Sequence, residues 1–186
     1  HWEENWDSLP SIKGKLADGI LKVLDKIPLP GSGITSTVSD KPEAYEYYLK
    51  GKFRYEKRKS LEDVEMGRGL LIRAISLDKN LISARNMLGW TYDDSGDHKR
   101  AIEIYEKSLS TAKKAKDKHG TMVTYGSMGV VNLNMGFLDN ALDFLKKQQA
   151  FAKELDDKYE FSAALGNRGY IYLQKADFKQ AKECFE

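Results

Sequence analysis

Few residues in this chain have the type and spacing that metal or acid–base chemistry needs. Three histidines could act as metal ligands or proton carriers, and they are His1, His98 and His119. They lie too far apart in the sequence pattern to predict a metal site. Three carboxylates form an acidic turn, and they are Asp93, Asp94 and Asp97. A calcium loop needs acidic residues at alternate positions and a distant glutamate, so we expect a solvated turn or a groove charge instead.

Cys184 is the only cysteine of the 186 residues, which excludes an internal disulfide and a cysteine-based zinc cluster. It stands beside Phe185 in an expected helix, where a core position is more typical than a nucleophile. The sequence contains no serine elbow, no HExxH motif and no Walker loop. We therefore expect a protein that is not an enzyme and that needs neither a metal nor another cofactor.

The composition indicates a folded domain, because 41% of the residues are hydrophobic and only 4 are proline. Lys and Arg number 30 against 28 Asp and Glu, and these charges are spread along the chain. Nucleic-acid binding needs a concentrated basic face, and a membrane span needs about 20 consecutive apolar residues. We expect neither nucleic acid nor membrane as a partner, and a cytoplasmic location. The chain starts at His1 without methionine, so we interpret it as part of a longer protein.

Small residues recur in phase along the chain, which is the main signal for its architecture. One set of glycines is spaced by 40 residues and consists of Gly89, Gly129 and Gly169. Twelve residues after each glycine stands an alanine, and these are Ala101, Ala141 and Ala181. Four residues after each alanine stands a large residue, and these are Tyr105, Leu145 and Phe185. An earlier and looser copy has Gly51 and Gly67 in the two small positions.

Each repeat is predicted to be a pair of antiparallel helices. The glycine lets the two helices approach closely, the alanine lets the next repeat dock, and the large residue fills the remaining volume. Gly96 lies in the expected turn of one pair, and Asp97 is the expected cap of its second helix. Asp40 is expected to open a capping box just before Pro42, and Ser60 to restart the helix after a longer connection.

This pattern resembles the tetratricopeptide repeat family. The family motif is met in the second repeat by Leu88, Gly89, Tyr92, Gly96, Ala101 and Tyr105. The period of 40, in place of about 34, is similar to that of kinesin light chains, and "GNRG" at 166–169 resembles a signature of that subgroup. The resemblance implies an all-α right-handed superhelix of antiparallel helix pairs. Its repeats are expected at about 42–79, 80–118, 119–158 and 159–186, the last one truncated within its second helix.

The first forty residues differ in character from the rest. Residues 1–27 predict a short strand followed by an amphipathic helix, and residues 28–41 predict a linker. The sequence resembles the end of a bacterial TolB-like domain, on the residues Trp2, Glu4, Trp6 and Asp7 and the later "PEAY" at 42–45. Such regions follow adenylate cyclases, Ser/Thr kinases or DNA-binding regulators. The resemblance therefore implies a regulatory segment whose output domain lies outside this chain.

A binding groove is expected on the concave face, which the first helices of stacked pairs line. Trp90, Val130 and Tyr170 are in register as an apolar column, and Asn86, Gly126 and Gly166 form a column of small residues that leaves room beside it. The candidate groove residues are Tyr48, Lys52, Tyr55, Asn86, Trp90, Asp93, Val130, Asn134, Tyr170 and Gln174. Asn134 and Gln174 would hydrogen-bond the backbone of a peptide, and Asp93 would favour a basic group. The alternative is that these aromatic side chains belong to the core.

The sequence thus predicts a non-catalytic scaffold that binds a protein or peptide in its concave groove. Two alternatives stay open at this stage. One is a regulatory C-terminal segment of a bacterial multidomain signalling enzyme, and the other is a structural or oligomerisation module without a peptide ligand. Self-association is expected through the last repeat, whose large apolar residues Tyr172, Phe178 and Phe185 lack a following repeat.

Overall fold

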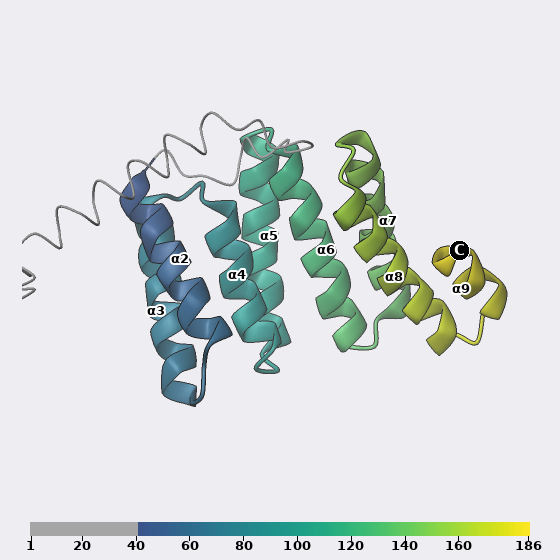
Figure 1. Ribbon diagram of the computed structural model, residues 1–186, viewed down its shortest axis with the longest axis horizontal. Coiled ribbons are helices and arrows are strands. Elements are labelled where there is room, and N and C mark those ends of the chain that lie inside the picture. The colour runs from purple at the N-terminus through teal and green to yellow at the C-terminus, as the bar shows by residue number, and fades with distance from the viewer. Residues whose placement is uncertain (1–40) are drawn as a thin grey trace, which may run out of the picture. The chain divides into compact units, whose positions relative to one another are not determined.

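The structure of the chain is a computed structural model, which describes residues 41–186. The strand and helix expected within residues 1–27, and nearly all of the expected linker, lie outside the described residues. Within residues 41–186 the chain forms eight helices and no strand (Figure 1). These helices are α2 (Pro42–Glu56), α3 (Leu61–Leu77), α4 (Ile82–Asp93), α5 (His98–Lys114), α6 (Lys118–Asn134), α7 (Leu138–Glu154), α8 (Lys158–Gln174) and α9 (Phe178–Phe185).

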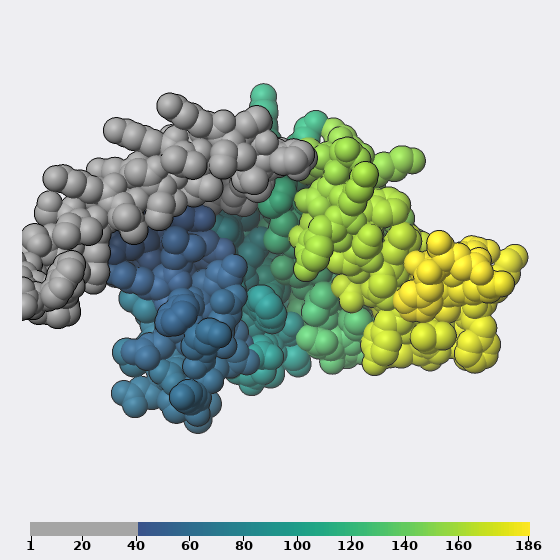
Figure 2. Space-filling model, in the orientation of Figure 1, coloured from purple at the N-terminus to yellow at the C-terminus, as the bar shows by residue number. Residues whose placement is uncertain are grey.

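Each helix packs against the next one in the chain, so that the helices form antiparallel pairs: α2 with α3, α4 with α5, α6 with α7, and α8 with α9. The first helices of successive pairs also contact each other, α2 with α4, α4 with α6 and α6 with α8. Side chains fill the spaces that the ribbons leave open (Figure 2). The predicted all-α stack of helix pairs is confirmed. Among the described helices, none is both long and apolar enough to cross a bilayer.

Short polar side chains start most of the helices, and the two predicted caps, Ser60 and Asp97, are among them. The Ser60 hydroxyl accepts a hydrogen bond from the Asp63 N–H at 3.2 Å, and the Asp97 carboxylate accepts one from the Arg100 N–H at 3.2 Å. Such caps satisfy backbone donors that have no partner within the helix. The prediction for α2 is wrong in its detail, because the residue that caps this helix is Lys41, whose side chain makes no capping bond. Asp40 itself lies outside the described residues.

The in-phase glycines face the large residues that follow them sixteen positions later. A Cβ atom on Gly89 would lie 2.5 Å from a ring carbon of Tyr105, and one on Gly169 would lie 2.5 Å from a ring carbon of Phe185. Because real Cβ atoms do not approach other atoms so closely, only glycine lets the second helix place its large side chain there. The predicted role of the glycines, which is to let the two helices of a pair approach closely, is therefore confirmed.

The apolar core runs through the stack as three clusters in chain order. The first joins α2, α3 and α4 around Leu71, the second joins α5 and α6 around Tyr105, and the third joins α7 and α8 around Leu145. The in-phase alanines are fully or almost fully buried. Cys184 is also buried, as expected for a core position. This continuous packing holds the first helices side by side, which builds the groove described next.

Candidate ligand-binding groove

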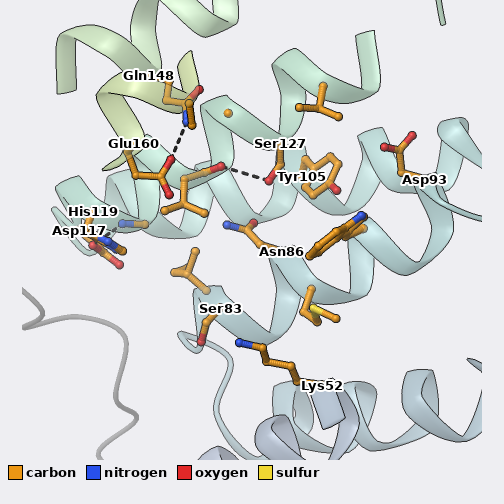
Figure 3. Close-up of a pocket in the computed structure, with 18 of the residues that line it drawn as sticks. Lys52, Ser83, Asn86, Asp93, Tyr105, Asp117, His119, Ser127, Gln148 and Glu160 are labelled. Carbon is orange, nitrogen blue, oxygen red and sulfur yellow. Dashed lines mark hydrogen bonds between the residues drawn. The ribbon is translucent and has the colours of Figure 1, made fainter. Parts of the chain in front are cut away.

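The first helices of the pairs surround a hollow of about 720 Å³ (Figure 3). Helices α4 and α6 contribute most of its wall, α2 contributes Tyr48 and Lys52, and α8 contributes only its first turns. The apolar part of the wall consists of Ile82, Met87, Trp90, Val123, Val130 and Ala163. A hollow of this size with an apolar wall and a few polar groups is typical of a ligand site.

Trp90 is the most prominent apolar side chain of this hollow. It lines the wall from α4, yet 55% of its surface is exposed. Val130, which stands at the matching position of α6, lines the same wall. Tyr170 is in register with both and equally exposed at 53%, but it does not line the hollow. The reason is that α8 reaches the hollow only with Tyr159, Glu160 and Ala163, near the start of the helix.

Asn86 lines the hollow but uses its amide inside the protein. Its Nδ2 donates to Thr124 Oγ1 at 3.0 Å, and Ser108 Oγ donates to its Oδ1 at 2.5 Å. All three side chains are buried, and they come from α4, α5 and α6. This network fixes the relative positions of two inner helices, so Asn86 shapes the wall rather than offering a free amide.

Asp93 supplies a buried negative charge at one end of the groove. Only 5% of it is exposed, and its two oxygens are both occupied. Oδ1 lies 2.6 Å from His98 Nδ1, and Oδ2 accepts a hydrogen bond from Asn134 Nδ2 at 3.0 Å. Asn134, at the end of α6, therefore binds Asp93 of α4. It does not line the hollow, so the predicted contact of Asn134 with a peptide backbone is wrong.

Tyr55 is a correction to the predicted groove. It is buried with 3% exposed, and its hydroxyl donates to Asp94 Oδ2 at 2.5 Å. The backbone of Tyr55 lies close to Gly67 on α3, so this side of α2 packs in the core. Burial raises the pKa of the Tyr55 phenol, and the hydrogen bond to Asp94 raises it further. Gln174 is likewise absent from the wall of the hollow and is exposed.

Tyr48 and Lys52 reach the hollow from α2, as predicted. Burial raises the pKa of the Tyr48 phenol, so this group remains a neutral hydrogen-bonding group at physiological pH. Lys52 Nζ lies 3.8 Å from Glu56 Oε1, a loose and exposed ion pair. Its ammonium group therefore remains available to a ligand, because exposed pairs of this kind are weak.

Several polar residues of the wall were missed by the sequence analysis, and they are Asp117, His119, Ser127, Gln148 and Glu160. Gln148 comes from α7, and its Nε2 donates to Glu160 Oε2 at 2.6 Å (Figure 3). The space predicted beside Gly126 is occupied by this side chain, since a Cβ on Gly126 would lie 2.6 Å from Gln148 Nε2. Beside Gly166 the predicted space is open. A helix periodicity cannot reveal Gln148, because the residue reaches the wall from a second helix.

The acidic groups of this wall are engaged in contacts within the protein. Within residues 41–186, no three His, Cys, Asp or Glu side chains are arranged so that they could hold a metal ion. The carboxylates of Asp93 and Glu160 are each engaged in hydrogen bonds. The groove therefore offers apolar surface and fixed polar groups to a bound segment, with Lys52 as a mobile charge.

The stacked helix pairs, with a glycine in the first helix facing a large residue in the second, define the tetratricopeptide-repeat architecture. Residues 82–114 and 162–186 match the tetratricopeptide repeat in its family profile. These two segments correspond to the pair α4 and α5 and to most of the pair α8 and α9. A comparison with curated protein sequences gives no match.

Solved structures share the fold at low sequence identity. The apo form of RapI is 14% identical with a TM-score of 0.68, over 83% of this chain and 57% of that one. A Rap protein complexed with Competence and Sporulation Factor is 16% identical with a TM-score of 0.63, over 99% and 65%. BtubC (BKLC) from P. vanneervenii is 16% identical with a TM-score of 0.65, over 76% and 59%.

The chain thus spans about three fifths of the length of these structures, and the similarity concerns the fold. The finer resemblances, to kinesin light chains and to a TolB-like domain, stay predictions. So do the repeat boundaries at about 42–79, 80–118, 119–158 and 159–186.

Proposed function

We propose that this chain is a non-catalytic, cytoplasmic scaffold that binds a peptide or an extended protein segment in the groove between α2, α4, α6 and α8. The observation that carries the proposal is Trp90, a large aromatic side chain that is more than half exposed inside a hollow of about 720 Å³. An exposed aromatic residue in a concave apolar wall is typical of the central anchor of a protein interface.

The chemistry around Trp90 specifies the kind of segment that fits. Met87 and Val130 provide apolar surface for one or two apolar side chains of the ligand. Lys52 stands on the wall as well, and its ammonium group is exposed, so a segment that also carries an acidic or polar group is favoured over a purely apolar one (Figure 3). In support, the fold is shared with a Rap protein that is complexed with Competence and Sporulation Factor.

A phage-displayed library of random linear peptides tests the proposal, with selection on the wild-type chain. We expect the selected peptides to bind the Trp90→Ala variant at least about tenfold more weakly, because an aromatic anchor in an interface typically carries that much affinity. Tyr170→Ala is a matched control, since Tyr170 is equally exposed but lies outside the hollow. Its affinity should change by less than about twofold.

Two results would overturn the proposal. One is a selection that enriches no peptide on the wild-type chain. The other is an equal loss of affinity in Trp90→Ala and Tyr170→Ala, because that result would place the binding surface elsewhere. Circular dichroism of both variants checks that the helix content is unchanged, so that a loss of binding is a property of the groove.

A further inference from the structure

A second hollow, of about 620 Å³, lies between the connection that precedes α4 and the C-terminal half of α5. Its wall consists of Lys79, Asn80, Arg85, Lys107, Ser110, Thr111, Lys114 and Ala115. None of these residues lines the groove around Trp90. The hollow is therefore a separate site, and its chemistry differs, because most of its side chains are cationic or carry hydrogen-bond donors.

Four positive charges face this hollow, from Lys79, Arg85, Lys107 and Lys114, and no carboxylate belongs to its wall. Some lysines elsewhere in the described chain are paired with a carboxylate; for example, Lys118 lies 2.5 Å from a carboxylate oxygen of Glu154. Among residues 41–186, the three lysines of this hollow have no such partner within 4.0 Å. Their mutual repulsion is unfavourable, and a bound anion would relieve it.

Arg85 gives the site a fixed element. Its Nη1 donates to Thr111 Oγ1 at 3.0 Å, and its Nη2 donates to the Lys79 carbonyl oxygen at 2.6 Å. These bonds use two of the five guanidinium donors and hold the planar group in place. The partial burial of Arg85 lowers its pKa, while the neighbouring charge of Asp78 raises it. A half-buried guanidinium that is already oriented is suited to a doubly charged oxyanion.

The next helix pair shows that the repeat does not require this cationic arrangement. Forty residues after Arg85 and Thr111 stand Tyr125 and Phe151, whose ring centroids lie 6.0 Å apart. Forty residues after Lys114 stands Glu154, which pairs with Lys118. The same place in the architecture is thus filled by an aromatic pair in one repeat and is open and positively charged in the other.

We propose that this hollow binds a doubly charged phosphoryl group. Arg85 would meet the phosphoryl oxygens with its remaining N–H donors, and Lys107 and Lys114 would neutralise the charge from α5. Ser110 adds a hydroxyl on the same wall. The wall contains no aromatic ring on which a nucleobase could stack, so the site selects the phosphoryl group and not a base.

Isothermal titration of the 186-residue chain with pyrophosphate tests this site, with potassium chloride used to keep the ionic strength constant. We expect saturable binding that weakens at least about tenfold in Lys107→Ala/Lys114→Ala, because two charge-assisted contacts are lost. The control is Lys146→Ala/Lys153→Ala on α7, which removes the same charge at the same spacing from exposed lysines. This control should change the affinity by less than about twofold.

A second variant guards against a loss of structure. Arg85→Tyr/Thr111→Phe transplants the aromatic pair of the next repeat, and we expect it to keep the thermal midpoint while abolishing pyrophosphate binding. A parallel titration with a phosphoserine peptide and its unphosphorylated form distinguishes a phosphorylated side chain from a free phosphate compound as the source of the group. The proposal is overturned if the wild type does not bind pyrophosphate, or if the α7 control loses as much affinity as the α5 variant.

Discussion

Whether a glycine of this chain can be replaced by alanine depends on which atoms an added Cβ would meet. Gly89 faces the Tyr105 ring, where an added Cβ would lie 2.5 Å from a ring carbon. We expect Gly89→Ala to lower the free energy of unfolding by about 1–3 kcal/mol, because Tyr105 must move in a close-packed core. Urea denaturation followed by circular dichroism measures this change.

Gly166 is the control for that experiment, because an added Cβ there meets no atom within 4 Å. Gly166→Ala should raise the free energy of unfolding by about 0.5–1 kcal/mol, since alanine is the better residue inside a helix. The two variants are thus expected to move in opposite directions. If Gly89→Ala and Gly166→Ala destabilise the protein equally, the close approach of Tyr105 is not the reason why glycine is needed at position 89.

The buried phenol of Tyr105 predicts a dependence of stability on pH. Burial raises its pKa, and the nearby charge of Asp93 raises it further. In the unfolded chain a tyrosine ionises near pH 10, so the neutral phenol is favoured by folding. The stabilisation is fully present below about pH 10 and is lost as the pH rises towards the raised pKa, by up to about 1.4 kcal/mol per pH unit for this group.

Urea denaturation at a series of pH values between neutral and strongly alkaline measures this effect. Tyr105→Phe keeps the ring against Gly89 and removes the ionisable group. The variant should therefore lose stability less steeply above pH 10 than the wild type. Identical slopes in the two proteins would contradict the assignment to Tyr105.

At the scale of helices, the sequence predicted the helix pairs and two of the helix starts, because these signals are local or periodic. The in-phase glycines and alanines predicted the helix pairs, and Ser60 and Asp97 predicted two helix starts. The groove was harder to predict, because spacing shows which residues share a side of a helix but not which neighbour covers that side. Tyr48 and Tyr55 share one side of α2, yet one reaches the hollow and the other is buried against Asp94.

The turns between helices give a prediction of their own. Gly96 and Gly136 have φ of 81° and 79°, and Ala176 stands at the matching turn between α8 and α9 with φ of 56°. A side chain in this left-handed region costs about 1–2 kcal/mol, so Ala176→Gly should raise the free energy of unfolding by about 1 kcal/mol. Ala150→Gly, at an exposed position inside α7, should instead lower it by about 0.5–1 kcal/mol. Thermal unfolding of both variants measures the two opposite changes.

At the scale of the molecule, the repeats share a backbone plan but differ in what they place at equivalent positions. Tyr125 and Phe151 pack as an aromatic pair where Arg85 and Thr111 hydrogen-bond across an open hollow. Both arrangements hold neighbouring helices together, so the stack tolerates the difference. Distinct surfaces can therefore arise within one fold, and the apolar groove and the cationic hollow are two such surfaces that share no residue.

The surface of α8 and α9 predicts self-association of the 186-residue chain. Leu173 and Phe178 are exposed on these helices. Helix α9 forms the yellow end of the chain in Figure 2. Forty residues earlier, Leu133 and Leu138 are packed against the cluster that contains Ile171, so the following helix pair covers them. Because a second copy can cover the same kind of surface, we expect a dimer that forms with rising concentration.

Sedimentation velocity over a range of concentrations tests this expectation with two matched variants. Phe178→Lys places a charge on the exposed surface and should shift the chain towards the monomer, because burying an unpaired charge in the contact is costly. Phe53→Lys is the control, since Phe53 is similarly exposed on α2, in the first described pair, with 64% against 70% for Phe178. A wild-type chain that stays monomeric at every concentration contradicts the expectation. So does a control that dissociates as readily as Phe178→Lys, because the contact would then not lie on α8 and α9.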